Sequence, residues 1–152
     1  MISSKALVVA SILASGTAAM ADKIALTEVP SAVSKAFAAR YPKLTPTVAE
    51  KEVGKDKTVT YELAAVVSKD NKTEATFTAD GTFLEEEMIV ALATLPPAVS
   101  KAFAAKYPKA KADRAEKQVK ADKTTTYELA FTTSKGRIEA TFKADGSFVE
   151  EE

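Results

Sequence analysis

The residues most able to do chemistry are carboxylates, and they occur in two matching sets. Asp80 precedes three consecutive glutamates at 85–87, and Asp145 precedes three more at 150–152. Carboxylate oxygens are preferred ligands of calcium, so Asp80 and Asp145 are candidate metal ligands. Neighbouring residues of a strand point to opposite faces, however, so three glutamates in a row do not converge on one ion. Solvated charge that protects a sheet edge is the alternative interpretation.

Catalysis finds little support in the composition. The chain contains no histidine and no cysteine, so the usual pairs of nucleophile and base are missing. Neither Gly-x-Ser-x-Gly nor Ser-x-x-Lys occurs in the expected mature chain, and the five glycines form no phosphate-binding loop. We therefore expect that the protein is not an enzyme and that it holds no cofactor, with calcium as the alternative.

The charge balance argues against nucleic acid as a partner. The chain has 21 Lys and Arg residues and 21 Asp and Glu residues. A leader that contains Lys5 would remove one of the basic residues, which leaves the mature chain slightly acidic. Proteins that bind phosphate backbones or anionic membrane surfaces need a basic excess instead.

Residues 1–21 have the features of a cleaved signal peptide. Lys5 supplies a positive start, residues 6–14 are apolar but too few to span a bilayer, and Ala19 and Ala21 place small residues where a signal peptidase reads. We expect cleavage between Ala21 and Asp22, a periplasmic or secreted product, and no membrane insertion after cleavage. Because cysteine is absent, no disulfide supports the exported chain.

The rest of the chain contains two similar sequences. Residues 30–42 return at 96–108, residues 60–64 at 126–130, and residues 79–81 at 144–146. A fixed period indicates a structural unit that is used more than once. We therefore expect a first unit at 22–87 and a second unit at 88–152.

Each unit begins with a predicted helix. In the first unit Val33, Phe37 and Tyr41 recur at a spacing of four, which is typical of a helix with one apolar stripe. Pro42 ends this helix, because the residue before proline is disfavoured in the helical region. A helix of three turns is unstable alone and needs a sheet to pack on.

Four strands are predicted to follow the helix. Alternating apolar and polar residues indicate strands at 48–53, 58–67, 73–79 and 82–85, and Asp80-Gly81 predicts a two-residue type I′ hairpin. The expected fold class is therefore α+β, a tandem repeat in which each unit packs one helix on its own four-stranded antiparallel sheet. The apolar connector at 88–92 should be buried, so we expect the two units to pack together.

The pattern of the second unit resembles a known family. Its motifs are Leu95-Pro96-x-Ala98-Val99-x-x-Ala102-Phe103-x-x-x-Tyr107-Pro108, Tyr127-Glu128-Leu129 and Phe142-x-Ala144-Asp145-Gly146. They resemble the PepSY-like family of exported bacterial proteins, which is also described as β-lactamase-inhibitor-like. The resemblance implies a non-catalytic binding or inhibitory module. Known inhibitors of this type are pairs of units whose sheets form a concave surface that grips an enzyme.

This chain departs from those inhibitors in its composition. They carry disulfides and an aromatic gripping face, whereas this chain has no cysteine and no tryptophan. The sheet face that should point away from the helices is rich in threonine with mixed charge, and we expect it to be solvated. We therefore expect no inhibition of β-lactamases.

The candidate partner-binding residues are those that the two units do not share. Phe131 has Ala65 as its counterpart, so it should fill the interface between the units or anchor a partner. The loops also diverge, with Thr45 replaced by Lys111 and Asn71 by Arg137. Divergent loops are the usual carriers of specific function. The remaining aromatic residues recur in pairs and should form the core of each unit.

The function that these observations favour is non-catalytic binding of another exported protein. The first alternative is a calcium-responsive or metal-binding periplasmic protein that uses Asp80 and Asp145. The second alternative is a structural module of the cell envelope. The sequence itself names no ligand.

Overall fold

The computed structural model describes residues 20–54, 56–68 and 71–152. Most of the predicted signal peptide lies outside these residues. The predicted cleavage site falls inside the first strand, β1 (Met20–Ile24), so a chain that begins at Asp22 keeps three residues of that strand. No helix among the described residues has the length and apolar character that crossing a membrane requires.

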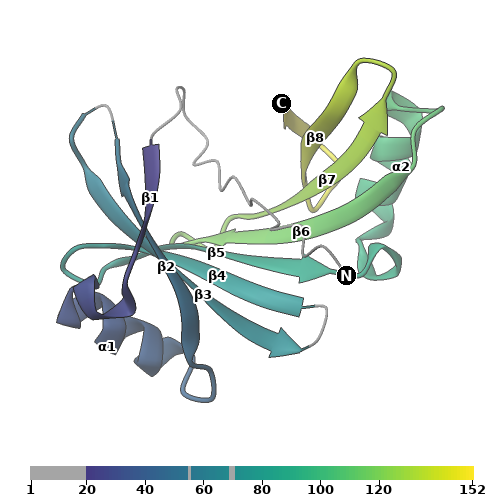
Figure 1. Ribbon diagram of the computed structural model, residues 1–152. Coiled ribbons are helices and arrows are strands. Elements are labelled where there is room, and N and C mark those ends of the chain that lie inside the picture. The colour runs from purple at the N-terminus through teal and green to yellow at the C-terminus, as the bar shows by residue number, and fades with distance from the viewer. Residues whose placement is uncertain (1–19, 55, 69–70) are drawn as a thin grey trace, which may run out of the picture.

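All the strands belong to one antiparallel sheet in which each strand pairs with the next one along the chain. After β1 the strands are β2 (Pro46–Val53), β3 (Val59–Ser68), β4 (Asn71–Thr78), β5 (Phe83–Val90), β6 (Ala112–Lys120), β7 (Thr125–Thr133), β8 (Gly136–Lys143) and β9 (Phe148–Glu151). Figure 1 shows this sheet running without interruption from the first strand to the last.

The expected fold of two units, each with its own four-stranded sheet, is therefore wrong. The segment predicted as a connector is the end of β5, where Met88, Ile89 and Val90 pair with residues of β6. An unpaired strand edge exposes a row of backbone N–H and C=O groups, and pairing β5 with β6 satisfies them. The chain is consequently mostly β, with one nine-stranded sheet and two short α-helices in the described part.

The two α-helices are α1 (Ser31–Arg40) and α2 (Pro97–Lys106), each preceded by a 3-10 turn, η1 (Leu26–Glu28) and η2 (Leu92–Thr94). Each α-helix buries one valine and one phenylalanine of the predicted stripe, which are Val33 and Phe37 in α1. In α2 the matching pair is Val99 and Phe103. The helix predictions are thus confirmed to within a residue or two of their ends.

Each α-helix covers a separate hydrophobic core on the same face of the sheet. Under α1 the buried cluster contains Leu63, Ala65 and Phe77, and under α2 it contains Leu129, Phe131 and Phe142. Aromatic rings meet edge to face in both clusters, as Phe37 does with Phe77. Aromatic side chains of the second half make the same kind of contact, with Phe103 against Phe142.

The turn at Asp80-Gly81 differs from the predicted two-residue hairpin. Its loop has three residues, because the backbone N–H of Thr78 bonds to the carbonyl of Thr82 at 2.9 Å, and only Gly81 has a positive φ, of 87°. Gly81 also touches the helix: a Cβ atom at this position would lie 2.7 Å from the carbonyl oxygen of Ala32. Glycine is therefore required both for the turn and for seating α1 on the sheet.

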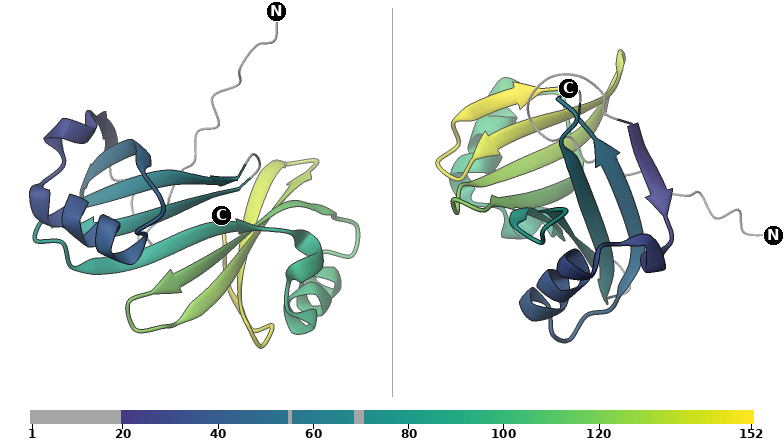
Figure 2. Two further views of the ribbon diagram at one scale, coloured as in Figure 1. Left: turned by 90° about the horizontal axis from the view of Figure 1, so that it is seen from below. Right: turned by 90° about the vertical axis from the view of Figure 1, so that its left-hand side faces the viewer.

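The sheet twists and bends so that its first and last strands rise on the same side (Figures 1 and 2). Both α-helices lie on the outside of this bend, which places the helix-free face on the inside. We call the helix-free face the concave face. The strong right-handed twist that adjacent strands prefer accumulates over a sheet of this width and produces such curvature.

Candidate functional site

The concave face is strongly acidic. The register of the strands places eleven glutamates on it against six Lys and Arg residues among the described residues, so its excess charge is negative although the whole chain is neutral. The glutamates are Glu50, Glu52, Glu62, Glu74, Glu85, Glu87, Glu116, Glu128, Glu139, Glu150 and Glu152. The basic residues are Lys23, Lys72, Arg114, Lys120, Arg137 and Lys143.

The glutamate run at 85–87 is divided between the two faces of the sheet, as strand geometry requires. Glu85 and Glu87 project from the concave face, and Glu86 projects from the helix face, where the Arg40 guanidinium lies 3.0 Å from its carboxylate. The second run is divided in the same way. Glu151 accepts a hydrogen bond from the Tyr107 hydroxyl on the helix side.

The centre of the concave face is buried, although the sequence predicts a solvated surface there. Glu74, Glu85, Glu87 and Glu116 are each no more than 9% exposed. We call Glu85, Glu87, Glu116 and Glu128 the carboxylate floor; they come from β5, β6 and β7, where the two sequence repeats meet. The prediction that this face is simply solvated therefore does not hold at its centre.

Burial and mutual repulsion shift the ionisation of the floor. Burial, followed by the nearby charges of Glu116 and Glu85, raises the pKa of Glu87 to about 9. Burial and the charges of Glu139 and Glu116 raise the pKa of Glu128 to about 7. The physical cause is the same in both cases, because low dielectric and neighbouring anions both disfavour the charged form.

Two cations compensate part of this charge. Lys72 forms an ion pair with Glu74, and Arg114 forms one with Glu116. Lys120 lies opposite Glu85 in the register and lowers the pKa of that carboxyl against the larger effect of burial. The Thr73 hydroxyl donates a hydrogen bond to the backbone carbonyl of Glu87 at 3.4 Å, but the Glu87 carboxyl group forms no hydrogen bond or ion pair with any of the described residues.

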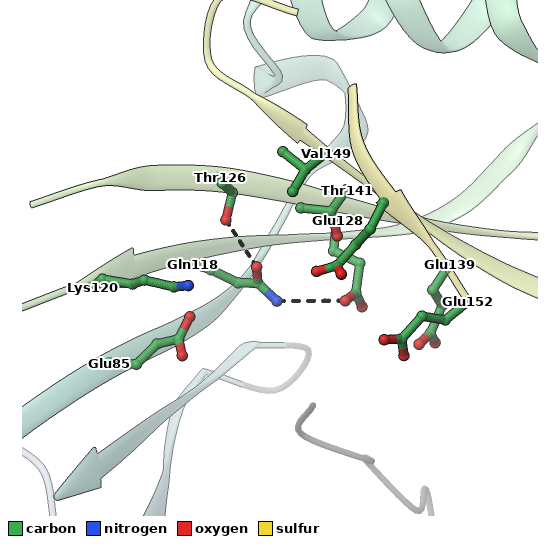
Figure 3. A pocket seen from close by; sticks show the side chains of 10 residues that line it. Glu85, Gln118, Lys120, Thr126, Glu128, Glu139, Thr141, Val149 and Glu152 are labelled. Carbon is green, nitrogen blue, oxygen red and sulfur yellow. Dashed lines mark hydrogen bonds between the residues drawn. The ribbon is translucent and has the colours of Figure 1, made fainter. Parts of the chain in front are cut away.

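A small pocket opens beside the floor on the second half of the sheet (Figure 3). Its lining includes Glu85, Gln118, Glu128, Glu139 and Glu152, and Figure 3 shows their polar groups directed into one common space. Gln118 connects two other side chains of this lining through hydrogen bonds. Its amide nitrogen donates to Glu128 at 3.4 Å, and its oxygen accepts from the Thr126 hydroxyl at 2.9 Å.

Phe131 lies elsewhere. It is fully buried in the second core, where its ring stands 5.1 Å from Phe103 and 4.6 Å from Tyr107 between centroids. Its side chain therefore offers no surface to a partner, and it packs within one core instead of between two units. The reason lies in the neighbouring positions: the first half places Leu44 against its core where the second has Ala110.

The four predicted loop residues are dispersed over the molecule. Thr45 and Lys111 are exposed in the loops that precede β2 and β6, and Asn71 begins β4. Arg137 is exposed and forms a bidentate ion pair with Asp113, at 3.1 and 2.9 Å. Among the described residues, no hydrogen bond or ion pair joins any two of these four. Their role in partner binding stays a prediction.

The predicted metal ligands have local structural roles. Asp80 accepts hydrogen bonds from the Thr78 hydroxyl and from the backbone N–H of Thr82, which lower its pKa. Asp145 accepts one from the backbone N–H of Ser147 at 2.9 Å. Within the described residues, no three carboxylates are grouped so that they could hold a metal ion.

The carboxylate floor could have been found in part from the sequence. Alternation along β5 places Glu85 and Glu87 on one face, and the same alternation places Glu116 and Glu128 there. What alternation does not show is that β5 lies inside the sheet, beside β6. That pairing joins residues from separate repeats and produces the burial.

The comparisons with known proteins agree with this architecture. The family profile described as "Putative beta-lactamase-inhibitor-like, PepSY-like" matches residues 16–66 and 63–150. No curated protein matches the sequence.

Two solved structures share the fold. A protein from Bacteroides eggerthii described as a putative periplasmic protein superimposes with a TM-score of 0.67 at 18% identity, covering 82% of this chain and 88% of its own. A BLIP-like protein from Bacteroides fragilis superimposes with a TM-score of 0.64 at 22% identity, covering 81% and 85%. The family profile covers more than half of the sequence, and these folds agree with it. The chain therefore belongs to the β-lactamase-inhibitor-like, PepSY-like family.

Proposed function

We propose that this chain is an exported, non-catalytic binding protein of the periplasm, and that its target is another exported protein. The family description as inhibitor-like and the periplasmic description of a structural neighbour support this function. The observation that carries the proposal is the concave face, an acidic surface that both halves of the chain build and that has a buried centre.

A sheet with a purely structural role would gain no stability from carboxylates buried at its centre. Burial of carboxylates without full compensation lowers the stability of the folded chain, because each charged form loses its hydration. Groups with strongly shifted ionisation gather at functional sites more often than elsewhere. The carboxylate floor therefore favours a binding role over that of an envelope scaffold.

The same face argues against a tight grip on a β-lactamase. Energetic hot spots of protein interfaces are enriched in Trp, Tyr and Arg. The aromatic side chains of the described residues lie on the helices or on the helix side of the sheet. A panel of β-lactamases should therefore show no inhibition by this protein.

Affinity capture from a periplasmic extract of the encoding bacterium tests the proposal. The purified chain is compared with a double variant, Glu139→Lys with Glu150→Lys, which reverses two charges in the lining of the pocket. We expect the wild type to enrich one protein reproducibly and the double variant to lose it, because charge reversal on a contact face opposes the partner directly.

A matched control alters the opposite face. Lys35→Glu with Lys101→Glu reverses two exposed charges on α1 and α2, and this variant should capture the same protein as the wild type. Capture that persists in the concave-face variant, or no reproducible enrichment at all, would contradict the proposed function.

A further inference from the structure

Glu87 is a buried carboxyl group of the concave face that no ion pair compensates among the described residues. It is 9% exposed, it lies opposite Glu74 on β4 and opposite Gln118 on β6, and no described residue forms a hydrogen bond or ion pair with its carboxyl group. In the described part of the chain the fully enclosed polar atoms without a partner belong to Asn71 and Arg114, so the Glu87 carboxyl is largely buried but not sealed off. Burial of such a group is costly unless a partner satisfies it. The Glu87 carboxyl is therefore a candidate site for a bound group that supplies the missing partner.

The charges around Glu87 come from every strand near it. Glu85 shares its strand, and Glu62, Glu116 and Glu128 raise its pKa from β3, β6 and β7. On β4, Glu74 is held by Lys72. On β6, Arg114 is held by Glu116, and Lys120 lies opposite Glu85. The cations nearest the floor are thus already committed to other carboxylates, and Glu87 retains a proton instead.

We propose that the partner of the concave face presents a segment rich in Lys or Arg, and that one of its cationic groups displaces the proton from Glu87. This inference rests on the proposed function and names the chemistry of its target. In the step, the O–H bond of the Glu87 carboxyl breaks, its proton passes to the solvent, and the carboxylate forms an ion pair with the ammonium or guanidinium group. No other bond changes.

The surface suits an extended basic polypeptide better than a metal ion. Neighbouring strands lie about 4.8 Å apart, so carboxylates on β5, β6 and β7 form a spread array. Calcium needs six to eight oxygens converging on one point, and the described residues offer no such group. A second copy of this chain is another source of cations, because α1 and α2 contain Lys and Arg but no acidic residue.

Proton release identifies this event. A bound cation that requires ionised Glu87 binds more tightly as the pH rises toward 9, because binding and deprotonation are linked. At pH 8, Glu128 with a pKa of about 7 is mostly ionised already, whereas Glu87 with a pKa of about 9 still holds its proton. Because burial also raises the pKa of Glu85 and of Glu116, comparison with Glu87→Gln assigns the proton released at pH 8 to Glu87.

The experiment is isothermal titration calorimetry of the full chain with octalysine at pH 8, in two buffers that differ in ionisation enthalpy. We expect binding that releases close to one proton and a dissociation constant that falls about 25-fold between pH 7 and pH 8.5, as a pKa of about 9 requires. Glu87→Gln should abolish the proton release. Glu86→Gln, which removes the same charge from the opposite face of the same strand, should behave as the wild type.

Several results would overturn the inference. One is octalysine binding without proton release, or equal release by Glu87→Gln. Another is binding of calcium chloride alone, with proton release, while octalysine does not bind. A third is self-association of the wild type in sedimentation that Glu87→Gln abolishes, which would identify a second copy as the occupant. If octalysine fails while the periplasmic partner is still captured, the inference fails and the proposed function stands.

Discussion

The two glutamate runs have the same sequence and different surroundings. On β5, Glu87 is 9% exposed and its pKa is raised to about 9, whereas its counterpart Glu152, which follows the last residue of β9, is exposed. The strands that carry the runs explain the difference. β5 lies between β4 and β6 near the middle of the sheet, and β9 is the last strand with β8 as its one neighbour. Identical residues thus acquire different chemistry from their place in the sheet.

The two hydrophobic cores differ as well, although both are complete. Leu44 packs against the first core and Ala65 lies inside it, while the second core has Ala110 and Phe131 at these positions. The first half thus has its large side chain in the loop before β2 and a small one on β3, and the second half has the reverse arrangement. The divergence at these positions preserves the packing of each core, since total volume matters more than which position supplies it.

The largest expected effect on stability comes from removing the large side chain of the second core. Phe131→Ala should destabilise the chain by about 3–4 kcal/mol in urea unfolding, because removal of a fully buried phenylalanine leaves a cavity. Adding Ala110→Leu should recover about 1–2 kcal/mol by supplying the residue of the first half. A double variant no more stable than Phe131→Ala would show that the two positions do not share one space.

The next effect sharpens the comparison of the glutamate runs. Glu87 has a pKa raised from 4.5 to about 9 in the folded chain, so the stability it contributes is complete below pH 4.5 and is lost as the pH rises toward 9. Glu87→Gln should therefore stabilise the chain at pH 8 by several kcal/mol, at about 1.4 kcal/mol for each pH unit above 4.5, and have little effect near pH 4.5.

Glu152→Gln is the matched control for this measurement. Because Glu152 is exposed and follows the last residue of β9, its replacement should change stability by less than about 0.5 kcal/mol at either pH. Urea unfolding of both variants at pH 5 and pH 8 provides the test. Equal effects of the two substitutions would mean that the position in the sheet does not matter.

The smallest effect concerns the basic residue at the end of each α-helix. The Arg40 guanidinium lies 3.7 Å from the centroid of the Phe83 ring and also binds Glu86, whereas the Lys106 ammonium lies 3.9 Å from the Phe148 ring. Arg40→Lys should cost about 0.5–1 kcal/mol, since lysine lacks the planar fork that makes both contacts. Lys106→Arg should be neutral within about 0.5 kcal/mol in thermal unfolding.

Local patterns predicted the elements well and their assembly poorly. Periodicity predicts the helix stripes and most strand positions. For β5 it predicts where the strand begins but not where it ends. The Asp-Gly turn predicts the beginning of β5, but its end at Met88–Val90 is apolar and follows no turn signal, so the local pattern there predicts a connector instead of a strand. The pairing of these residues with β6 depends on contacts between distant positions, which a local pattern does not contain.

The sequence by itself determined the period of the chain, the apolar stripe of each helix and the face on which each glutamate projects. These depend on the spacing of neighbouring residues, and the backbone geometry of helices and strands translates spacing directly into direction. The tertiary structure alone decided that nine strands of the described part share one sheet and that the carboxylates of β5 and β6 are buried beside the half-buried Glu128 of β7. Burial and charge repulsion are properties of surroundings, and the surroundings of Glu87 come from strands contributed by both halves of the chain.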